Sequence, residues 1–342
     1  MKELIAFDII DIKVCDEPKF CLKIQSEGFN GASMLKGILA VVAASVAYGF
    51  LPVFSKIALG TGLSSSAVVF WRFMMACLVV AVIMRVKKMS FRVTRVQLVH
   101  LCFFGLLGSG ITSLLLTVSY EHIPIGLATM FHFSYPLFVT IIMIIMYKEK
   151  ATPFKCISMA AALGGLILMA DFSGGMSLQG VLFAALSGLT YAIYVIATRK
   201  SAFALLPIFT TMFYVTLISS LYFGVQLLVT GSFMVPGSVT AWGAIASVAM
   251  LCTVFALCLL MRGIQLLGPV TASVLNMIEP VTSVIAGIFI FHDKLSVKAF
   301  AGCSLIVLSA LLISLDARRS ATRAEEPEPQ TVPAAPEGGE QI

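Results

Sequence analysis

The chain has 342 residues, of which 59% are hydrophobic and only 12% are charged, and its mean hydropathy is +1.00. About a quarter of the residues of a soluble domain are charged, so this composition excludes a soluble globular protein and indicates that the lipid bilayer is the solvent. The net charge of +6 comes from Lys and Arg residues that flank apolar segments. This placement indicates membrane topology and argues against nucleic acid as a partner.

Residues 1–33 form a polar N-terminal extension without an apolar run of membrane length, and they lack the pattern of a signal peptide. Two interpretations stay open. The extension is a genuine N-terminus, or it is not native and the chain starts at Met34, directly before the first apolar segment. Residues 317–342 are rich in Pro, Glu and Ala, which predicts a disordered cytoplasmic tail.

Apolar runs separated by polar breaks predict ten transmembrane helices, because ~20 helical residues span ~30 Å of hydrocarbon and lipid-exposed backbone has to satisfy its own hydrogen bonds. The expected fold class is therefore an all-α integral membrane protein. The predicted spans cover residues 36–58, 67–84, 97–119, 124–147, 156–172, 178–198, 208–229, 240–261, 269–291 and 298–316.

The distribution of Lys and Arg predicts the orientation of these helices. With the N-terminus inside, 14 Lys and Arg residues lie in the inner loops and the inner C-terminal flank, and 3 lie on the outer side. This count leaves out the N-terminal region and the intramembrane Arg72. Because positive residues are retained on the cytoplasmic side, we expect both termini in the cytoplasm of a multi-pass protein of the inner or plasma membrane.

The two halves of the chain resemble each other. Identical residue types recur at offsets of 143 or 144 residues, as in Gly37 and Gly180, Tyr48 and Tyr191, Ala128 and Ala272, and Pro136 and Pro280. Each half holds five predicted helices, and an odd number makes the second half enter the membrane from the opposite side. Residues 34–172 and 177–316 are therefore predicted to form two inverted repeats. Many secondary transporters are built in this way, with a binding site between the repeats near the midplane.

Glu279 is the only acidic residue in the middle of a long apolar segment. A carboxylate at that depth is costly, so such residues usually face a cavity and take part in function. Asn276 lies three residues earlier on the same helix face, and Pro280 follows directly. One hypothesis is that Glu279 lines a substrate cavity and carries a coupling proton, since burial favours the neutral form of a carboxyl group. The alternative is a structural tie to a neighbouring helix.

The same place in the first half holds His132 and Tyr135, directly before Pro136. We expect these two side chains to face Asn276 and Glu279 across the axis that relates the repeats. A proline cannot donate to the helix ladder, so Pro136 and Pro280 are predicted as hinges.

Four further residues are candidates for the cavity wall. Arg72 lies about one and a half turns into the second predicted span, where it is suited to hold an anionic group of a substrate. Two alternative roles for Arg72 stay open: its side chain extends to the outer interface beside Trp71, or it forms an ion pair with Glu279. Aromatic side chains in a cavity stack on organic substrates, although most intramembrane tyrosines only pack. The tyrosines considered are Tyr48, Tyr191 and Tyr194.

The order of these residues resembles the EamA-type drug/metabolite transporter superfamily over about residues 34–316. The matching features are Tyr48-Gly49, Arg72, the run from Tyr120 through Ile123-Pro124 and Ala128 to Pro136 and Glu149, then Gly268-Pro269, Asn276, Glu279-Pro280 and Asp293. Tyr48 stands where many members carry Trp, and Asp293 where the second repeat often has Glu. The resemblance implies a ten-helix exporter or exchanger of a small metabolite, and it leaves the substrate open.

We therefore predict a secondary transporter that exports small organic metabolites, amino acids or related compounds, by alternating access. The sequence has no phosphate-cradling Gly-rich loop, no His-Glu-x-x-His and no Gly-x-Ser-x-Gly, so we expect no catalytic residues, metal or cofactor. The expected partners are a small-molecule substrate and membrane lipid, and the choice between monomer and homodimer stays open. The rival hypotheses are an intramembrane enzyme that acts on lipid and a non-transporting sensor or assembly partner.

Overall fold

The structure is a computed structural model that describes residues 31–120, 122–123, 125–149, 152–169, 177–291 and 296–325. Most of the two tails, together with Pro124 and Asp293, lie outside these residues. Every regular element in the described part is a helix, which confirms the predicted all-α class.

The helices of the first half follow the five predicted spans, and three of these spans are divided into shorter elements. The elements are α2 (Gly31–Gly49), α3 (Leu51–Leu59), α4 (Ser65–Val86), α5 (Arg95–Gly105), the π-helix η1 (Leu106–Ile111), α6 (Thr112–Tyr120), α7 (Ile125–His132), α8 (Tyr135–Tyr147) and α9 (Pro153–Met169).

The second half repeats this order, with a short 3₁₀ helix added after its first helix. The elements are α10 (Leu178–Lys200), η2 (Ala202–Leu205), α11 (Ile208–Val229), α12 (Val239–Ala249), the π-helix η3 (Met250–Phe255), α13 (Ala256–Leu267), α14 (Pro269–Asn276), α15 (Glu279–Phe291) and α16 (Val297–Glu325).

Each predicted span corresponds to helical structure. Within the described residues, nine helices are long and apolar enough to cross a membrane, and the shorter apolar helix Pro153–Met169 takes the place of the tenth. The two halves agree in detail, since α4 and α11 start 143 residues apart, whereas α5 and α12, η1 and η3, and α8 and α15 start 144 residues apart. The interruptions of the third and fourth spans of each half are therefore repeated, whereas the break between α2 and α3 has no counterpart in α10.

Contacts between helix ends show that the halves run in opposite directions. Gly37, near the start of α2, lies so close to α13 that an added Cβ would be 2.8 Å from Leu267 Cγ. Directly after α13, Gly268 approaches Arg199 near the end of α10. The start of α2 and the end of α10 thus lie at the same end of the bundle, as an inverted repeat requires.

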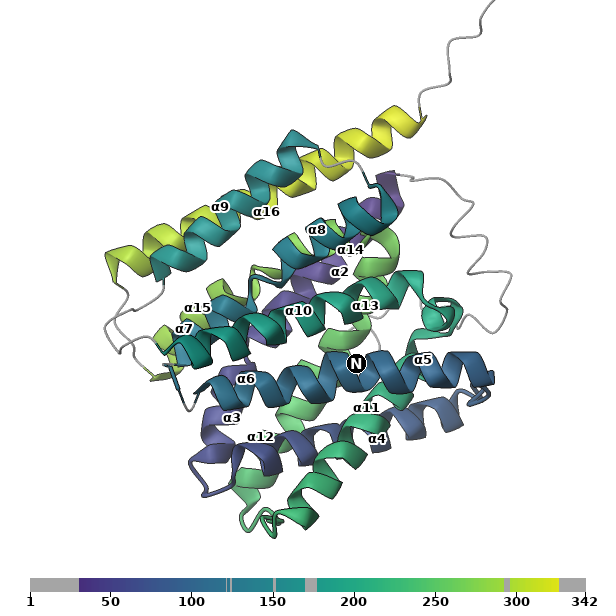
Figure 1. Cartoon of the computed structure of the whole chain (residues 1–342), viewed down its shortest axis with the longest axis vertical. Helices are drawn as coiled ribbons and strands as arrows, with labels where there is room; N and C mark the ends of the chain where they lie inside the picture. Colours follow the sequence, from purple (N-terminus) through teal and green to yellow (C-terminus); the bar gives the residue numbers. More distant parts are fainter. Residues whose placement is uncertain are drawn as a thin grey trace, which may run out of the picture.

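Helices of one half pack mainly on helices of the other (Figure 1). The pairs are α2 with α13, α6 with α10, α4 with α11, and α9 with α16. In Figure 1, α9 and α16 lie together at one extreme of the molecule, whereas α4, α11 and α12 lie at the opposite extreme. The two halves therefore share one core.

The outer faces of the bundle are apolar. Large hydrophobic side chains are more than half exposed on α4, α8 and α11, among them Val82, Ile145 and Leu228. Contiguous exposed apolar surface is unfavourable in water, but it is the expected surface of a protein that is solvated by lipid tails.

Two helix ends differ from the prediction. The helix α16 continues to Glu325, so residues 317–325, which were expected in the disordered tail, are helical. The helix α13 continues to Leu267, so Arg262, expected in an inner loop, lies within a helix. In α16 the apolar sequence ends before the helix does, because a helix can continue beyond the bilayer once its backbone hydrogen bonds are formed. In α13 the apolar sequence resumes after Arg262, and Ile264 and Leu267 are buried.

Candidate functional site

The centre of the bundle contains two broken helices in equivalent positions. The break between α7 and α8 falls at residues 133–134, and the break between α14 and α15 falls at residues 277–278. Pro136 and Pro280 are each the second residue of the helix that follows the break. Because proline lacks an N–H group and has a fixed φ, it is tolerated in the first turn of a helix but interrupts a continuous one. The breaks place Tyr135 and Glu279 at the first positions of α8 and α15.

Asn276 is the hub of a hydrogen-bond network at these breaks. Its Oδ1 accepts from Ser45 Oγ on α2 at 3.1 Å, and its Nδ2 donates to Tyr135 Oη at 3.2 Å and to Glu279 Oε2 at 3.3 Å. Tyr135 Oη in turn donates to the carbonyl oxygen of Ser273 at 3.3 Å. Asn276 is 2% exposed and Tyr135 is 1% exposed. A buried amide whose hydrogen bonds are satisfied is highly ordered, so the network joins helices of both halves.

His132 takes a different partner. Its Nδ1 lies 2.9 Å from Ser187 Oγ on α10, and Ser187 Oγ donates to the carbonyl oxygen of Ala184 at 2.6 Å. The hydroxyl proton of Ser187 is thus engaged, so the imidazole Nδ1 carries the proton of the His132–Ser187 bond. His132 and Tyr135 were expected to face Asn276 and Glu279; of the two, Tyr135 bonds Asn276 directly, and His132 bonds Ser187.

Aromatic rings from two helices fill the space beside this network. The rings of Tyr135 and Tyr191 meet edge to face with their centroids 4.8 Å apart, and Tyr191 lies 5.6 Å from His132 and 6.2 Å from Tyr194. Edge-to-face pairs at such separations are the favoured arrangement of aromatic rings. The wall of the centre is therefore both aromatic and hydroxyl-bearing.

Arg72 points into the bundle. Its Nε donates to Thr253 Oγ1 in the second half at 2.7 Å, and its guanidinium carbon lies 5.2 Å from the centroid of the Phe73 ring. Neighbouring Trp71 instead donates to the carbonyl oxygen of Met234 at 2.8 Å, near the end of the bundle. The guanidinium thus has a partner in the protein core, whereas the indole anchors the connection between α11 and α12.

The helix α2, which carries Tyr48, packs both against η3, whose Thr253 holds Arg72, and against α15, which begins at Glu279. Within the described residues, Arg72 and Glu279 form no direct ion pair. Among the residues that the structure describes, one carboxyl oxygen of Glu279 and both terminal amino groups of Arg72 have no hydrogen-bond partner. Both side chains are partly exposed, so each can accept a further ligand.

All eight candidate site residues therefore gather around one centre, with Tyr194 at its edge. The sequence analysis did not single out three polar residues that join them, which are Ser45, Ser187 and Thr253. Ser45 lies one helical turn before Tyr48 and Ser187 one turn before Tyr191, so their spacing carried a weak signal. Thr253 had none, because its partner Arg72 is 181 residues away.

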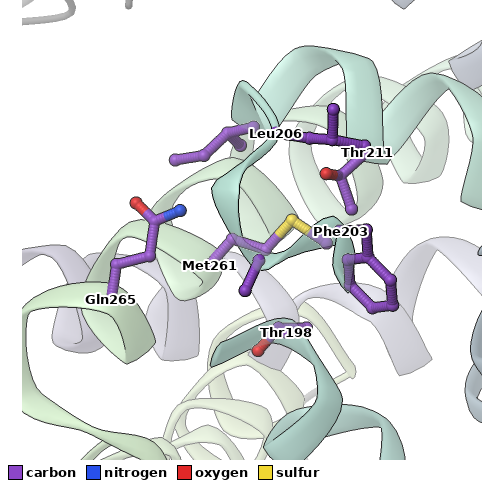
Figure 2. A pocket seen from close by; sticks show the side chains of 8 residues that line it. Thr198, Phe203, Leu206, Thr211, Met261 and Gln265 are labelled. Atoms are coloured by element: carbon purple, nitrogen blue, oxygen red, sulfur yellow. The ribbon is translucent and has the colours of Figure 1, made fainter. Parts of the chain in front are cut away.

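A small pocket lies away from this centre (Figure 2). It is formed where the end of α10, η2 and the start of α11 meet α13, and Met261 and Gln265 of α13 face it. Its volume of about 10 Å³ corresponds to roughly one water molecule. It is too small for a metabolite, so the central residues remain the candidate site.

The described residues contain no group of three or more His, Cys, Asp and Glu side chains that could hold a metal ion. The central groups are suited instead to hydrogen bonding, ion pairing and stacking with an organic molecule.

Comparison with known proteins identifies the family. The chain matches the EamA-like transporter family twice, over residues 35–170 and 178–315. A solved crystal structure with 19% sequence identity superposes with a TM-score of 0.70, covering 83% of this chain and 98% of the other. At that identity the likeness shows the fold alone. No curated protein sequence matches the chain. The two family matches span most of the sequence, and the protein is a member of the EamA-like transporter family.

Proposed function

We propose that the protein exports small zwitterionic metabolites, amino acids or related compounds, as a secondary transporter of the inner or plasma membrane. Membership of a transporter family supports a small-molecule substrate and argues against the lipid-modifying enzyme considered above. The observation that carries the substrate class is the separation of Arg72 and Glu279, a basic and an acidic side chain of one centre that are not paired with each other.

An amino acid matches this arrangement group by group. Its carboxylate suits the unpartnered amino groups of Arg72, because guanidinium binds carboxylate through two parallel hydrogen bonds. Its ammonium group suits the carboxylate of Glu279. The rings of Tyr48, Tyr191 and Tyr194 suit an aromatic or apolar side chain. A zwitterion adds no net charge to the membrane interior, whereas a substrate that carried only one charge would leave one of the two protein charges unpaired.

The two helix breaks supply a mechanism of alternating access. Rocking of one repeat against the other around a fixed midplane site is the usual scheme for inverted repeats. Pro136 and Pro280 stand at the only interruptions of α7–α8 and α14–α15 within the described residues, so we assign the hinge roles to these positions. The Asn276 network ties both breaks together and is the contact that has to rearrange when the bundle opens.

Transport by reconstituted protein tests the substrate class. L-phenylalanine, phenethylamine and 3-phenylpropionate share a side chain and differ in the carboxylate and the ammonium group. We expect wild-type proteoliposomes to transport L-phenylalanine faster than either analogue by about tenfold, since one lost charged hydrogen bond of ~1.5–3 kcal/mol corresponds to at least that factor.

Arg72→Ala is expected to remove the preference for L-phenylalanine over phenethylamine. An unchanged apparent affinity for L-phenylalanine in this variant would rule out Arg72 as the carboxylate ligand. Specific binding without flux of any amino acid would favour a non-transporting sensor. Parallel assays with and without a pH gradient separate proton coupling from transport driven by the substrate gradient alone.

Accessibility labelling tests the proposed orientation, with both termini in the cytoplasm. The segments around Ser90 and Thr210 share one end of the bundle, because Thr210 Oγ1 donates to Ser90 O at 3.2 Å. In a cysteine-free background, we expect a membrane-impermeant maleimide added to intact cells to label Thr61→Cys and Ser232→Cys. It is expected to spare Arg92→Cys and Lys200→Cys, and inside-out vesicles are expected to give the reverse. Labelling of positions 92 and 200 from opposite sides would contradict the fold itself.

A further inference from the structure

We propose that Thr253 is a positioning residue for Arg72, and that the π-helix η3 places the Thr253 hydroxyl so that the terminal edge of the guanidinium is presented to a substrate carboxylate. This inference rests on the proposed function, because it specifies how the carboxylate is recognised.

The direction of each hydrogen bond at Thr253 is fixed by its partners. Thr253 Oγ1 lies 3.1 Å from the carbonyl oxygen of Val248, which only accepts, so the single hydroxyl proton is donated there. The oxygen then accepts from Arg72 Nε at 2.7 Å, and Thr253 is 1% exposed. A hydroxyl that is buried and engaged on both sides is an oriented dipole with its negative end toward the guanidinium.

This bond selects one edge of the guanidinium for the substrate. A carboxylate can approach an arginine side-on, through Nε and one terminal nitrogen, or end-on, through both terminal nitrogens. Because Thr253 occupies Nε, only the end-on approach of Arg72 keeps two parallel hydrogen bonds. Thr253 therefore decides the direction from which the carboxylate binds.

The π-helix explains why the hydroxyl lies at this place. In η3 the backbone bonds reach back five residues, as in the bond from Ala256 N to Leu251 O. One inserted residue turns the following helix by about 100°, because an α-helix has 3.6 residues per turn. The segment η3 packs against α4, which carries Arg72. Short π-helical segments occur often at functional sites.

The first half provides an internal comparison. There η1 occupies the equivalent place. Thr112, the residue directly after η1, bonds the carbonyl oxygen of Leu107, five residues back, through its Oγ1 at 2.9 Å. Its other partner is the neutral hydroxyl of Thr190 at 2.7 Å. At the offset of 143 residues, the position of Arg72 is occupied by Val215 in the second half. The offset of 144 residues places Ser109, and not Thr112, at the position of Thr253. A threonine that bonds a carbonyl oxygen five residues back thus accompanies both π-helices at different positions, and the one in η3 holds a charged group.

The test is the proteoliposome assay with L-phenylalanine and phenethylamine as the two probes. Thr253→Val keeps the shape of the side chain and removes the hydroxyl. We expect it to raise the apparent KM for L-phenylalanine about tenfold and to leave the KM for phenethylamine, which has no carboxylate, within about twofold. Thr253→Ser restores the hydroxyl and is expected to restore the KM for L-phenylalanine. Thr112→Val removes a buried hydroxyl that also bonds five residues back, at the start of α6, and is expected to change neither value.

Three results would overturn the positioning role while the proposed function stands. These are an unchanged KM for L-phenylalanine in Thr253→Val, an equal rise of KM for both probes, and a failure of Thr253→Ser to restore the wild-type value. Retained flux of phenethylamine shows that a variant is folded. If the wild-type protein itself does not distinguish the two probes, the proposed function is wrong, and the positioning role falls with it.

Discussion

Glu279→Gln is expected to lower the flux of L-phenylalanine at least about tenfold. The substitution keeps the size of the side chain and its hydrogen bond to Asn276, which lies 3.3 Å away in the wild-type protein. It removes the acidic group that the proposal assigns to the ammonium group of the substrate. Losing a hydrogen bond between a charged substrate group and the protein costs ~1.5–3 kcal/mol, and each 1.4 kcal/mol is a factor of about ten. Initial rates in proteoliposomes measure the effect.

Two comparisons sharpen this prediction. Flux of 3-phenylpropionate, which lacks the ammonium group, is expected to change much less than that of L-phenylalanine. Glu149→Gln is the matched control, because Glu149 pairs with Lys155 at 2.9 Å at the end of α8 and is 33% exposed. Such a pair contributes ~0–1 kcal/mol, so the flux is expected to stay within about twofold. If Glu279→Gln left both the flux and its pH dependence untouched, neither substrate binding nor proton coupling could be assigned to Glu279.

The second prediction concerns stability. Gly165→Ala is expected to destabilise the protein by about 1–3 kcal/mol, the usual cost of overpacking a tight contact. An added Cβ would lie 2.6 Å from the carbonyl oxygen of Gly302 and 2.8 Å from Ile306 Cγ1. The first neighbour is backbone and cannot rotate away, so α9 and α16 would have to separate. The expected readouts are a lower midpoint of thermal unfolding and a smaller monodisperse fraction in detergent.

The adjacent residue serves as the control. At Gly164 the nearest atom to an added Cβ is Leu305 Cδ2 at 3.4 Å, an ordinary van der Waals distance. Because alanine is the better helix former by about 1 kcal/mol, Gly164→Ala is expected to be neutral or stabilising. Equal tolerance of the two substitutions would show that α9 does not pack against α16 through the face that contains Gly165.

The resemblance between the halves allowed part of the site to be predicted. An acidic residue within an apolar run is conspicuous in any sequence, so Glu279 could be chosen as a candidate site residue without a structure. Asn276 was then chosen because it lies three residues earlier on the same helix face. The internal repeat then pointed to Tyr135, which the structure places 3.2 Å from Asn276. It also pointed to His132 as part of the same polar face, and the structure places His132 Nδ1 2.9 Å from Ser187 Oγ, a residue that the repeat did not point to.

The sequence alone indicated that lipid surrounds the protein, and it predicted the ten spans and the breaks near Pro136 and Pro280. It also showed that one basic and one acidic residue, Arg72 and Glu279, lie in the apolar part of the chain. These properties depend on composition and on neighbouring residues, which a linear pattern records. Only the tertiary structure decided that Arg72 meets Thr253 and that Ser45 meets Asn276, across 181 and 231 residues. Such contacts depend on how each helix is rotated about its axis. A helix that is apolar all round carries no polar face from which that rotation can be inferred, and the π-helices that change it have no simple sequence signature.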